Sequence, residues 1–423
     1  MYLREMKKLI TNLSCLKYAV LALPLAFAGL PIYVHVPKFY AQIMEINLAS
    51  LGILLFCTRL ADTFIDPLIG VLSDKFVKFR RLIIIFCLPI LALGYFLLFS
   101  PPNFAYNSPL IWLGCCLLLV YISFSTLMIN YYAIGIDISG GEQDNTKIAT
   151  WREGFMLLGV LLASLLPPIL MQQYDLKTYY QIFGIILAPL LIFSAFFTLV
   201  KYQPILSQEK TEISFLRLLE SKKIRYILLL AFFNAIPTAI TSTLFMFFTS
   251  DVLKAPEQSG FMLSAYFLSA AISTPFWNYL SGIIGKRKSL LIAMILSIIC
   301  FIWAWTLGAN DIWNFYIICV LSGITMGADV VLMPSLFADA LSDRRNLSAT
   351  AFGLWNLTSK LTMAFAAILV LPLLSQFGYH AAMNNNVNAL SALSFCYAIL
   401  PCVFKAGAAS FLYFNSISGD KKL

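Results

Sequence analysis

Charged side chains are scarce in this sequence. Asp, Glu, Lys and Arg make up 12% of the 423 residues, hydrophobic residues make up 60%, and the mean hydropathy is +0.84. Because a soluble domain is about one quarter charged, this scarcity excludes a water-exposed globular surface. The ten-residue alternation of barrel strands is also missing. The expected solvent is therefore lipid and the expected structure is helical.

Motifs of catalysis and of ATP use are lacking as well. Only two histidines occur, His35 and His380, and no H-E-x-x-H or G-x-S-x-G run is present. An intramembrane enzyme is thus the least favoured class. No G-x-x-x-x-G-K-[ST] run occurs, so an ion gradient is the indicated energy source.

The nine cysteines have no metal-ligand or disulfide spacing and are expected to be small buried hydrophobes. No cofactor is predicted.

Long apolar stretches supply the expected architecture. A stretch of about 20 apolar residues spans a bilayer as a helix, and Pro, Gly, Asn and charge clusters separate such stretches here. We predict an all-α membrane protein with twelve transmembrane helices. The predicted spans are 18–36, 47–72, 82–100, 109–136, 154–171, 180–200, 224–250, 259–283, 289–308, 312–337, 347–374 and 390–414.

The placement of positive charge predicts the orientation. With the N-terminus inside, 23 of the 29 lysines and arginines fall in inner segments, whereas the outer loops hold only Lys38, Lys177 and Lys254. This bias predicts cytoplasmic termini. It also accounts for the net charge of +9 without a polyanionic partner, so no nucleic acid is expected.

The chain divides into two similar halves. The longest polar interruption predicts an N-terminal six-helix bundle at 1–200, a cytoplasmic linker at 201–223 and a C-terminal bundle at 224–423. Pro67–Ser73 and Pro275–Ser281 are similar runs at an offset of 208 residues, each followed by basic residues. A repeat across two six-span halves is typical of the major facilitator architecture.

The charges near this repeat are not duplicated, which predicts a special polar site in the N-terminal half. Arg59, Asp62 and Asp66 correspond at the same offset to Phe267, Ala270 and Thr274. Asp62 and Asp66 share a helix face, and Asp62 lies about 18 Å from the inner end of its span. A bare carboxylate there costs about 2.5–3.5 kcal/mol or more. We predict a cation site at Asp62, Asp66 and the neighbouring Thr63; the alternative is a structural salt bridge with Arg59 or Lys360.

Further polar residues lie within or beside the other spans. Lys360 shares a face of span eleven with Asn356, and it would compete with a cation if it reached Asp62; a bridge between the halves is the alternative. Asn130 and Tyr132 give span four a polar, aromatic face. We predict coupling or gating roles for Arg59, Asp74, Lys75, Asp329 and Lys360. For Asp74 and Lys75, at the inner end of span two, the alternative is solvated anchoring.

The run from Arg59 to Asp74 resembles the span-two signature of the glycoside–pentoside–hexuronide:cation symporters. Arg152, Ala338-Asp339 and the run from Trp355 to Lys360 also fit that family. The resemblance implies that Asp62 and Asp66 bind the coupling Na⁺, Li⁺ or H⁺. It further implies substrate-binding roles for Arg152 and Lys360, which match basic residues near the sugar and cation sites, and for Tyr132, which lies about where an aromatic ring stacks on the sugar.

Three departures from the family pattern concern the ligands. Ile65 replaces a polar residue between the two acids, which favours H⁺ over Na⁺. Leu25-Ala26-Phe27 replaces the region of a span-one acid that holds sugar hydroxyls, and Met128 stands near the position of a span-four acid. Coupling is therefore better preserved than sugar specificity.

The sequence as a whole predicts a secondary active transporter that couples H⁺ or Na⁺ to symport of a small solute by alternating access. A sugar or glycoside is the candidate solute. The expected partners are the solute and the lipid bilayer, the expected state is a monomer, and the expected location is a bacterial inner membrane. One alternative is an exporter or lysolipid carrier on the same fold. An alternative of another class is a non-transporting receptor or scaffold.

Overall fold

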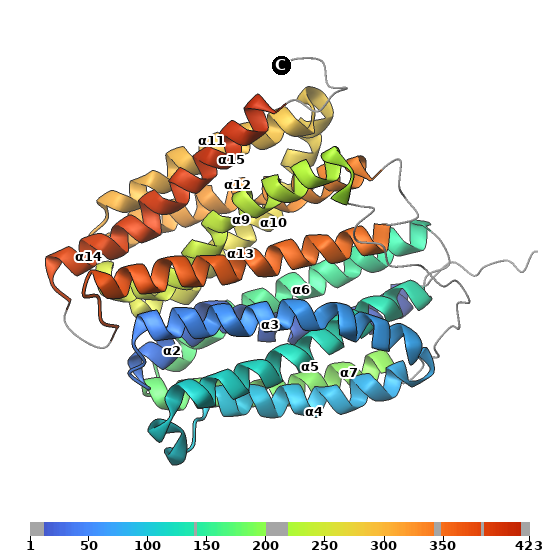
Figure 1. The fold of residues 1–423 in the computed structure, drawn as a ribbon, viewed down its shortest axis with the longest axis horizontal. Helices are drawn as coiled ribbons and strands as arrows, with labels where there is room; N and C mark the ends of the chain where they lie inside the picture. The colour runs from blue at the N-terminus through green and yellow to red at the C-terminus, as the bar shows by residue number, and fades with distance from the viewer. Residues whose placement is uncertain (1–11, 139–141, 200–218, 342–347, 382–384, 416–423) are drawn as a thin grey trace, which may run out of the picture. The chain divides into compact units, whose positions relative to one another are not determined.

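The computed structural model describes residues 12–138, 142–199, 219–341, 348–381 and 385–415 (Figure 1). These segments are helical almost throughout, and no strand occurs within them. The prediction of an all-α chain is therefore confirmed. Since lipid offers backbone groups no hydrogen bonds, each spanning segment has to satisfy them internally, as a helix does.

The helices of the N-terminal half precede the predicted linker. They are α1 Asn12–Ala19, α2 Ala22–Gln42, α3 Leu48–Lys75, α4 Arg80–Phe99, α5 Pro109–Ile138, α6 Glu142–Met171 and α7 Leu176–Leu199.

The helices of the C-terminal half follow the predicted linker, and two of them are composite. They are α9 Lys222–Phe247 with the π-helical η3 Phe248–Val252, α10 Ser259–Ile284, α11 Lys286–Ile302, α12 Ile312–Ala340, α13 Ser348–Gln376, and α14 Val387–Ser394, which continues through the π-helical η7 Phe395–Ile399 into α15 Leu400–Phe414. The repeated prolines both lie inside helices, Pro67 in α3 and Pro275 in α10.

Eleven of the twelve predicted spans are confirmed. Eleven helical segments among the described residues are long and apolar enough to cross a membrane. The remaining predicted span, 259–283, coincides with α10, whose 26 residues are about 39 Å long. Two helices differ in extent from the predicted apolar spans. The first span is broken between Ala19 and Ala22, and α6 begins at Glu142 rather than at 154, because a helix can continue past its apolar part into the polar region.

Contacts between Cα atoms group the chain into two compact units. The first unit comprises residues 1–32 and 64–209, and the second comprises 33–63 and 210–423. The division falls within α2 and within α3. The predicted bundles at 1–200 and 224–423 remain a prediction, and residues 201–218 of the predicted linker lie outside the described residues.

Close contacts explain why residues 33–63 belong to the second unit. The Gln42 side chain at the end of α2 donates a hydrogen bond to the Ala381 carbonyl, at 2.9 Å. At Gly52 of α3, an added Cβ would lie 2.9 Å from the Ala367 carbonyl oxygen of α13. A glycine is needed there because the two helix backbones approach more closely than any side chain allows.

Small residues bring α10 and α12 equally close. Cβ atoms added at Gly323 and Gly327 would lie 2.3 Å from the Tyr266 carbonyl oxygen and 2.1 Å from the Ser273 hydroxyl oxygen. Ser273 and Trp277 both donate hydrogen bonds to the Ile324 carbonyl, at 2.9 and 2.7 Å. Backbone contact between small residues is a common way to pack helices in lipid, where the hydrophobic effect does not drive association.

Replacing Gly327 with Val is expected to destabilise the protein by about 2–3 kcal/mol, since overpacking forces helices apart. Thermal unfolding of the purified protein in detergent measures this as a lower Tm. Gly282→Ala in α10 is the matched control because an added Cβ there meets nothing within 4 Å. Equal Tm values for the two variants would contradict the close approach of α10 and α12.

Large apolar side chains cover much of the surface. Ile192 and Tyr279 are each 71% exposed, and Phe64 is 67% exposed. Such exposure is unfavourable in water but natural against acyl chains. The inner packing is also apolar, for example around Trp277 and Met294 of the second unit. The few buried polar groups therefore stand out, and they define the candidate sites.

Candidate functional site

An ion pair within the second unit joins α3 to α13. The Lys360 ammonium lies 2.7 Å from Asp62 Oδ2, and the two side chains are only 24% and 8% exposed. The structure therefore brings together the two predicted residues of opposite charge. A carboxylate and an ammonium this far from water need each other or another ion, because charge burial is costly.

Two neighbouring residues of α3 add a hydroxyl oxygen and a second positive charge to the same helix. Thr63 is 2% exposed and its hydroxyl donates to the Arg59 carbonyl, one turn earlier, at 2.9 Å. This bond uses the hydroxyl proton, so the oxygen lone pairs remain available to a cation. The Arg59 guanidinium carbon lies 4.2 Å from the centroid of the Tyr33 ring. The ring face stabilises this positive charge without using a carboxylate.

Asp66 lies one turn further along α3 than Asp62 and is half-buried. The division between the two units falls between Thr63 and Phe64, so Asp66 belongs to the first unit. Asp74 and Lys75 are at the end of α3, and their side chains lie outside the described residues.

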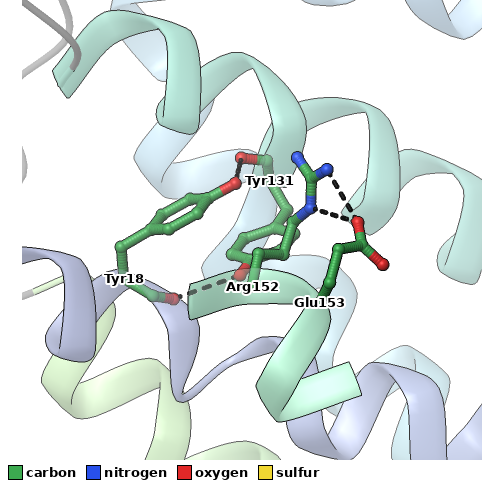
Figure 2. A network of polar contacts seen from close by, with 4 residues as sticks. All are labelled: Tyr18, Tyr131, Arg152 and Glu153. Atoms are coloured by element: carbon green, nitrogen blue, oxygen red, sulfur yellow. Dashed lines mark hydrogen bonds and ion pairs between the residues drawn. The ribbon is translucent and has the colours of Figure 1, made fainter. Parts of the chain in front are cut away.

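In the first unit, a cation–π contact joins α5 to α6. The Arg152 guanidinium lies 4.6 Å from the centroid of the Tyr132 ring. Arg152 also donates two hydrogen bonds to Glu153 Oε1, at 3.1 and 2.8 Å (Figure 2). The structure thus brings the predicted solute ligands Tyr132 and Arg152 together. It leaves Arg152 only 21% exposed and Glu153 61% exposed.

Beside this contact, Tyr18 of α1 stacks on Tyr131, with ring centroids 4.5 Å apart. Each hydroxyl donates to the other residue's carbonyl, at 3.2 and 3.3 Å (Figure 2). An added Cβ at Gly135 would lie 2.6 Å from the Tyr18 hydroxyl oxygen. This reciprocal pair holds α1 against α5 next to Arg152.

The other predicted solute ligands differ in exposure. Asn130 is 1% exposed, accepts a hydrogen bond from Ser73 at 2.9 Å, and donates to the Thr126 carbonyl at 2.8 Å. It joins α5 to α3 within the first unit. Asn356, in contrast, is exposed and lies one turn before Lys360 on α13.

Asp329 forms a second intramembrane ion pair. Its Oδ2 lies 2.6 Å from the Lys405 ammonium of α15, and its Oδ1 accepts a hydrogen bond from Asn234 of α9 at 3.0 Å. The sequence placed Lys405 within a span but gave it no role.

The sequence did not predict roles for Tyr18, Tyr33, Glu153, Asn234 and Lys405. Polar or aromatic side chains within apolar helices were a visible signal for each. Their partners were not visible, because helix periodicity gives a residue's face but not the neighbouring helix.

The donor set suits a proton or a monovalent cation. Carboxylate and hydroxyl oxygens are the ligands that hard cations prefer. Asp62, Asp66 and Thr63 supply these groups within two turns of one helix. Within the described residues, no group of three or more His, Cys, Asp or Glu side chains could hold a metal ion.

Comparison with known proteins identifies the class. Residues 17–419 match the family described as MFS/sugar transport protein, and the chain belongs to this family. The sodium-dependent lysophosphatidylcholine symporter 1 of Gallus gallus is 24% identical, with 80% of this chain and 72% of that protein covered. The isoprimeverose transporter of Lactiplantibacillus pentosus is 23% identical, with 89% of this chain and 83% of that protein covered.

Solved structures show the same fold. The nucleoside transporter NupG superposes with a TM-score of 0.73 at 13% identity and covers 96% of this chain and 100% of its own. A bacterial homologue of the human lysosomal transporter Spinster, inward-facing, superposes with a TM-score of 0.71 at 15% identity, with 95% and 97% covered. The chain is thus a multi-pass membrane transporter with the major facilitator fold, not an enzyme. The expected class, a membrane transporter, is confirmed by the family, and relatives are named as symporters.

Proposed function

We propose that this chain couples the entry of a proton or Na⁺ at Asp62 to the symport of a small solute. The observation that carries the proposal is the 2.7 Å pair between Asp62 and Lys360. The proposed cation ligands are Asp62, Asp66 and Thr63. The proposed location is a bacterial inner membrane with both termini cytoplasmic, where the chain acts as a monomer.

Competition at Asp62 supplies the coupling in this proposal. Without the cation, the Lys360 ammonium neutralises the carboxylate. A cation that binds Asp62 displaces the ammonium, which then requires another negative or hydrogen-bonding partner. A solute beside Lys360 can be that partner. Binding of the cation and of the solute then favour each other, as reciprocal linkage requires.

The proposed solute contacts are Asn356 and Lys360 in the second unit and Asn130, Tyr132 and Arg152 in the first. Tyr132 offers a ring face, and Arg152 offers donors to hydroxyl or carboxylate oxygens. Such groups suit a sugar or glycoside, and a relative is named as an isoprimeverose transporter. Ile65, between the two acids, supplies no oxygen ligand, which favours H⁺ as the coupling ion.

Gating in this proposal involves charges outside the solute contacts. They are Arg59, Asp74, Lys75 and Asp329, together with Lys360. Alternating access would move the proposed bundles 1–200 and 224–423 as bodies.

A lysolipid or other amphiphile is the second candidate solute. Its support is the apolar run Leu25-Ala26-Phe27, which stands where the resembled symporter family has an acid that holds sugar hydroxyls. A relative is also named as a lysophosphatidylcholine symporter.

Uptake into proteoliposomes tests this proposal. Radiolabelled glycosides and lysophosphatidylcholine are offered under an imposed Na⁺ gradient, an imposed H⁺ gradient or none. We expect one solute class to accumulate above equilibrium under one gradient, and an ionophore for that ion to abolish the accumulation. Equal uptake with and without gradients would contradict coupling. No uptake of any solute would favour a receptor or scaffold.

A further inference from the structure

A small pocket lies within the second unit, and Asp62 is not among the residues that line it. Residues of α9, α10, α11, α12 and α15 line it, including Thr241, Tyr266, Ser322, Asp329 and Lys405. Its water-accessible volume is about 50 Å³, which is enough for a few water molecules. A space of this size beside buried charged groups needs a reason, because closer packing would remove it.

One carboxylate and one ammonium face this pocket. Lys405 and Asp329 are 6% and 13% exposed, and they form the 2.6 Å ion pair that joins α15 to α12. Asn234 is 4% exposed and its amide nitrogen donates to the other Asp329 oxygen. Both carboxylate oxygens are therefore held in place by groups from two other helices.

Three hydroxyls in the wall of the pocket present acceptors. The hydroxyls of Thr241, Ser322 and Thr325 donate to backbone carbonyls of their own helices, at 3.1, 2.6 and 2.8 Å. A hydroxyl has a single proton, so each of these oxygens has only lone pairs left for the pocket. Asn234, which contacts Asp329 but does not line the pocket, has a further buried acceptor: its Oδ1 has no hydrogen-bond partner among the described residues.

A buried carboxylate surrounded by oxygen acceptors is the environment of a hard monovalent cation. Here the positive charge comes from the chain itself. We propose that the pocket around Asp329 is a second cation site, in which the tethered ammonium of Lys405 takes the place of a free Na⁺ or K⁺. The inference does not rest on the role of Asp62, because the two sites share no residue.

Removal of the tethered charge tests the site. Lys405→Met leaves a net negative charge beside the acceptors, and a free cation of about the size of the ammonium can then enter. The full-length protein is purified in detergent, and Tm is measured in NaCl, KCl and choline chloride at equal ionic strength. In NaCl or KCl, we expect the Tm of Lys405→Met to be about 2 °C or more higher than in choline chloride. This difference should exceed any difference in Tm that the wild type shows between the same salts.

Two further variants identify the site. Adding Asp329→Asn to Lys405→Met removes the carboxylate and is expected to abolish the excess response. Adding Asp62→Asn and Lys360→Met instead removes the other ion pair and is expected to leave the excess response intact. An excess that survives Asp329→Asn would place the cation elsewhere and overturn the proposal.

A purely structural ion pair predicts a different result. Lys405→Met would then lose the same stability in all three salts, and that outcome also overturns the proposal. If Lys405→Met is not recovered in folded form in any salt, Lys405→Gln is measured in its place. It keeps a donor to Asp329 but no charge, and absence of a salt-specific response in this variant counts against the site.

Discussion

Replacing Asp62 with Asn is expected to reduce gradient-driven accumulation of the solute at least about tenfold, to its equilibrium level. The amide nearly matches the carboxylate in shape but carries no charge, so it cannot neutralise a bound cation. It also cannot hold the Lys360 ammonium 2.7 Å away as an ion pair. Coupling needs both the cation-bound state of Asp62 and the state in which Asp62 is paired with Lys360, and the substitution removes both.

Accumulation and exchange have to be measured separately. In proteoliposomes, Asp62→Asn should still exchange labelled for unlabelled solute without a gradient, because the solute contacts are intact. A receptor or scaffold, in contrast, predicts that the substitution changes nothing. A variant that concentrates solute as well as the wild type would make Asp62 structural and remove the main support for coupling.

Asp175→Asn is the matched control. Asp175 lies between α6 and α7, outside the membrane spans, and its carboxylate accepts hydrogen bonds from the backbone of Lys177 and Thr178. Hydrogen bonds from Thr178 hold the pKa of this carboxyl below its ordinary value, so it stays ionised through the neutral range. Asn caps a helix as well as Asp does, and we expect unchanged accumulation and an unchanged Tm.

The fold was predictable because lipid imposes a simple rule on the sequence. Each spanning segment must be long, apolar and helical, and eleven of the predicted spans follow that rule. Helix ends such as Glu142 of α6 were not predictable in the same way, because polar residues outside the hydrocarbon can continue a helix or end it.

The candidate site was predictable only in part, for a related reason. The cost of burying charge singled out Asp62, Lys360 and Asp329. The Asp62–Lys360 pairing was one of two stated alternatives, but Lys405 was not predicted as the partner of Asp329. A span tells how deep a charge lies and on which face of its helix. It does not tell which of the other helices lies opposite, and that choice depends on backbone contacts such as Gly327 against the Ala270 carbonyl.

Lys360→Met is expected to destabilise the protein by about 3 kcal/mol, because it leaves the Asp62 carboxylate, 8% exposed, without its ammonium partner. The double variant Asp62→Asn/Lys360→Met removes both charges and should recover most of that stability. Such non-additivity is the signature of a direct interaction. Thermal unfolding of the wild type, the two single variants and the double variant measures it.

The same four proteins separate a coupling pair from a structural bridge. If the ammonium competes with the coupling cation, its removal should raise the affinity of Asp62 for that cation about tenfold or more. The lost stability of Lys360→Met would then return as Na⁺ is added or as the pH is lowered, by mass action. The double variant, which lacks the carboxylate, should respond to neither. A Lys360→Met protein that is destabilised alike at every Na⁺ concentration and pH would identify the pair as a bridge, and the exchange of ammonium for cation at Asp62 would have to be abandoned.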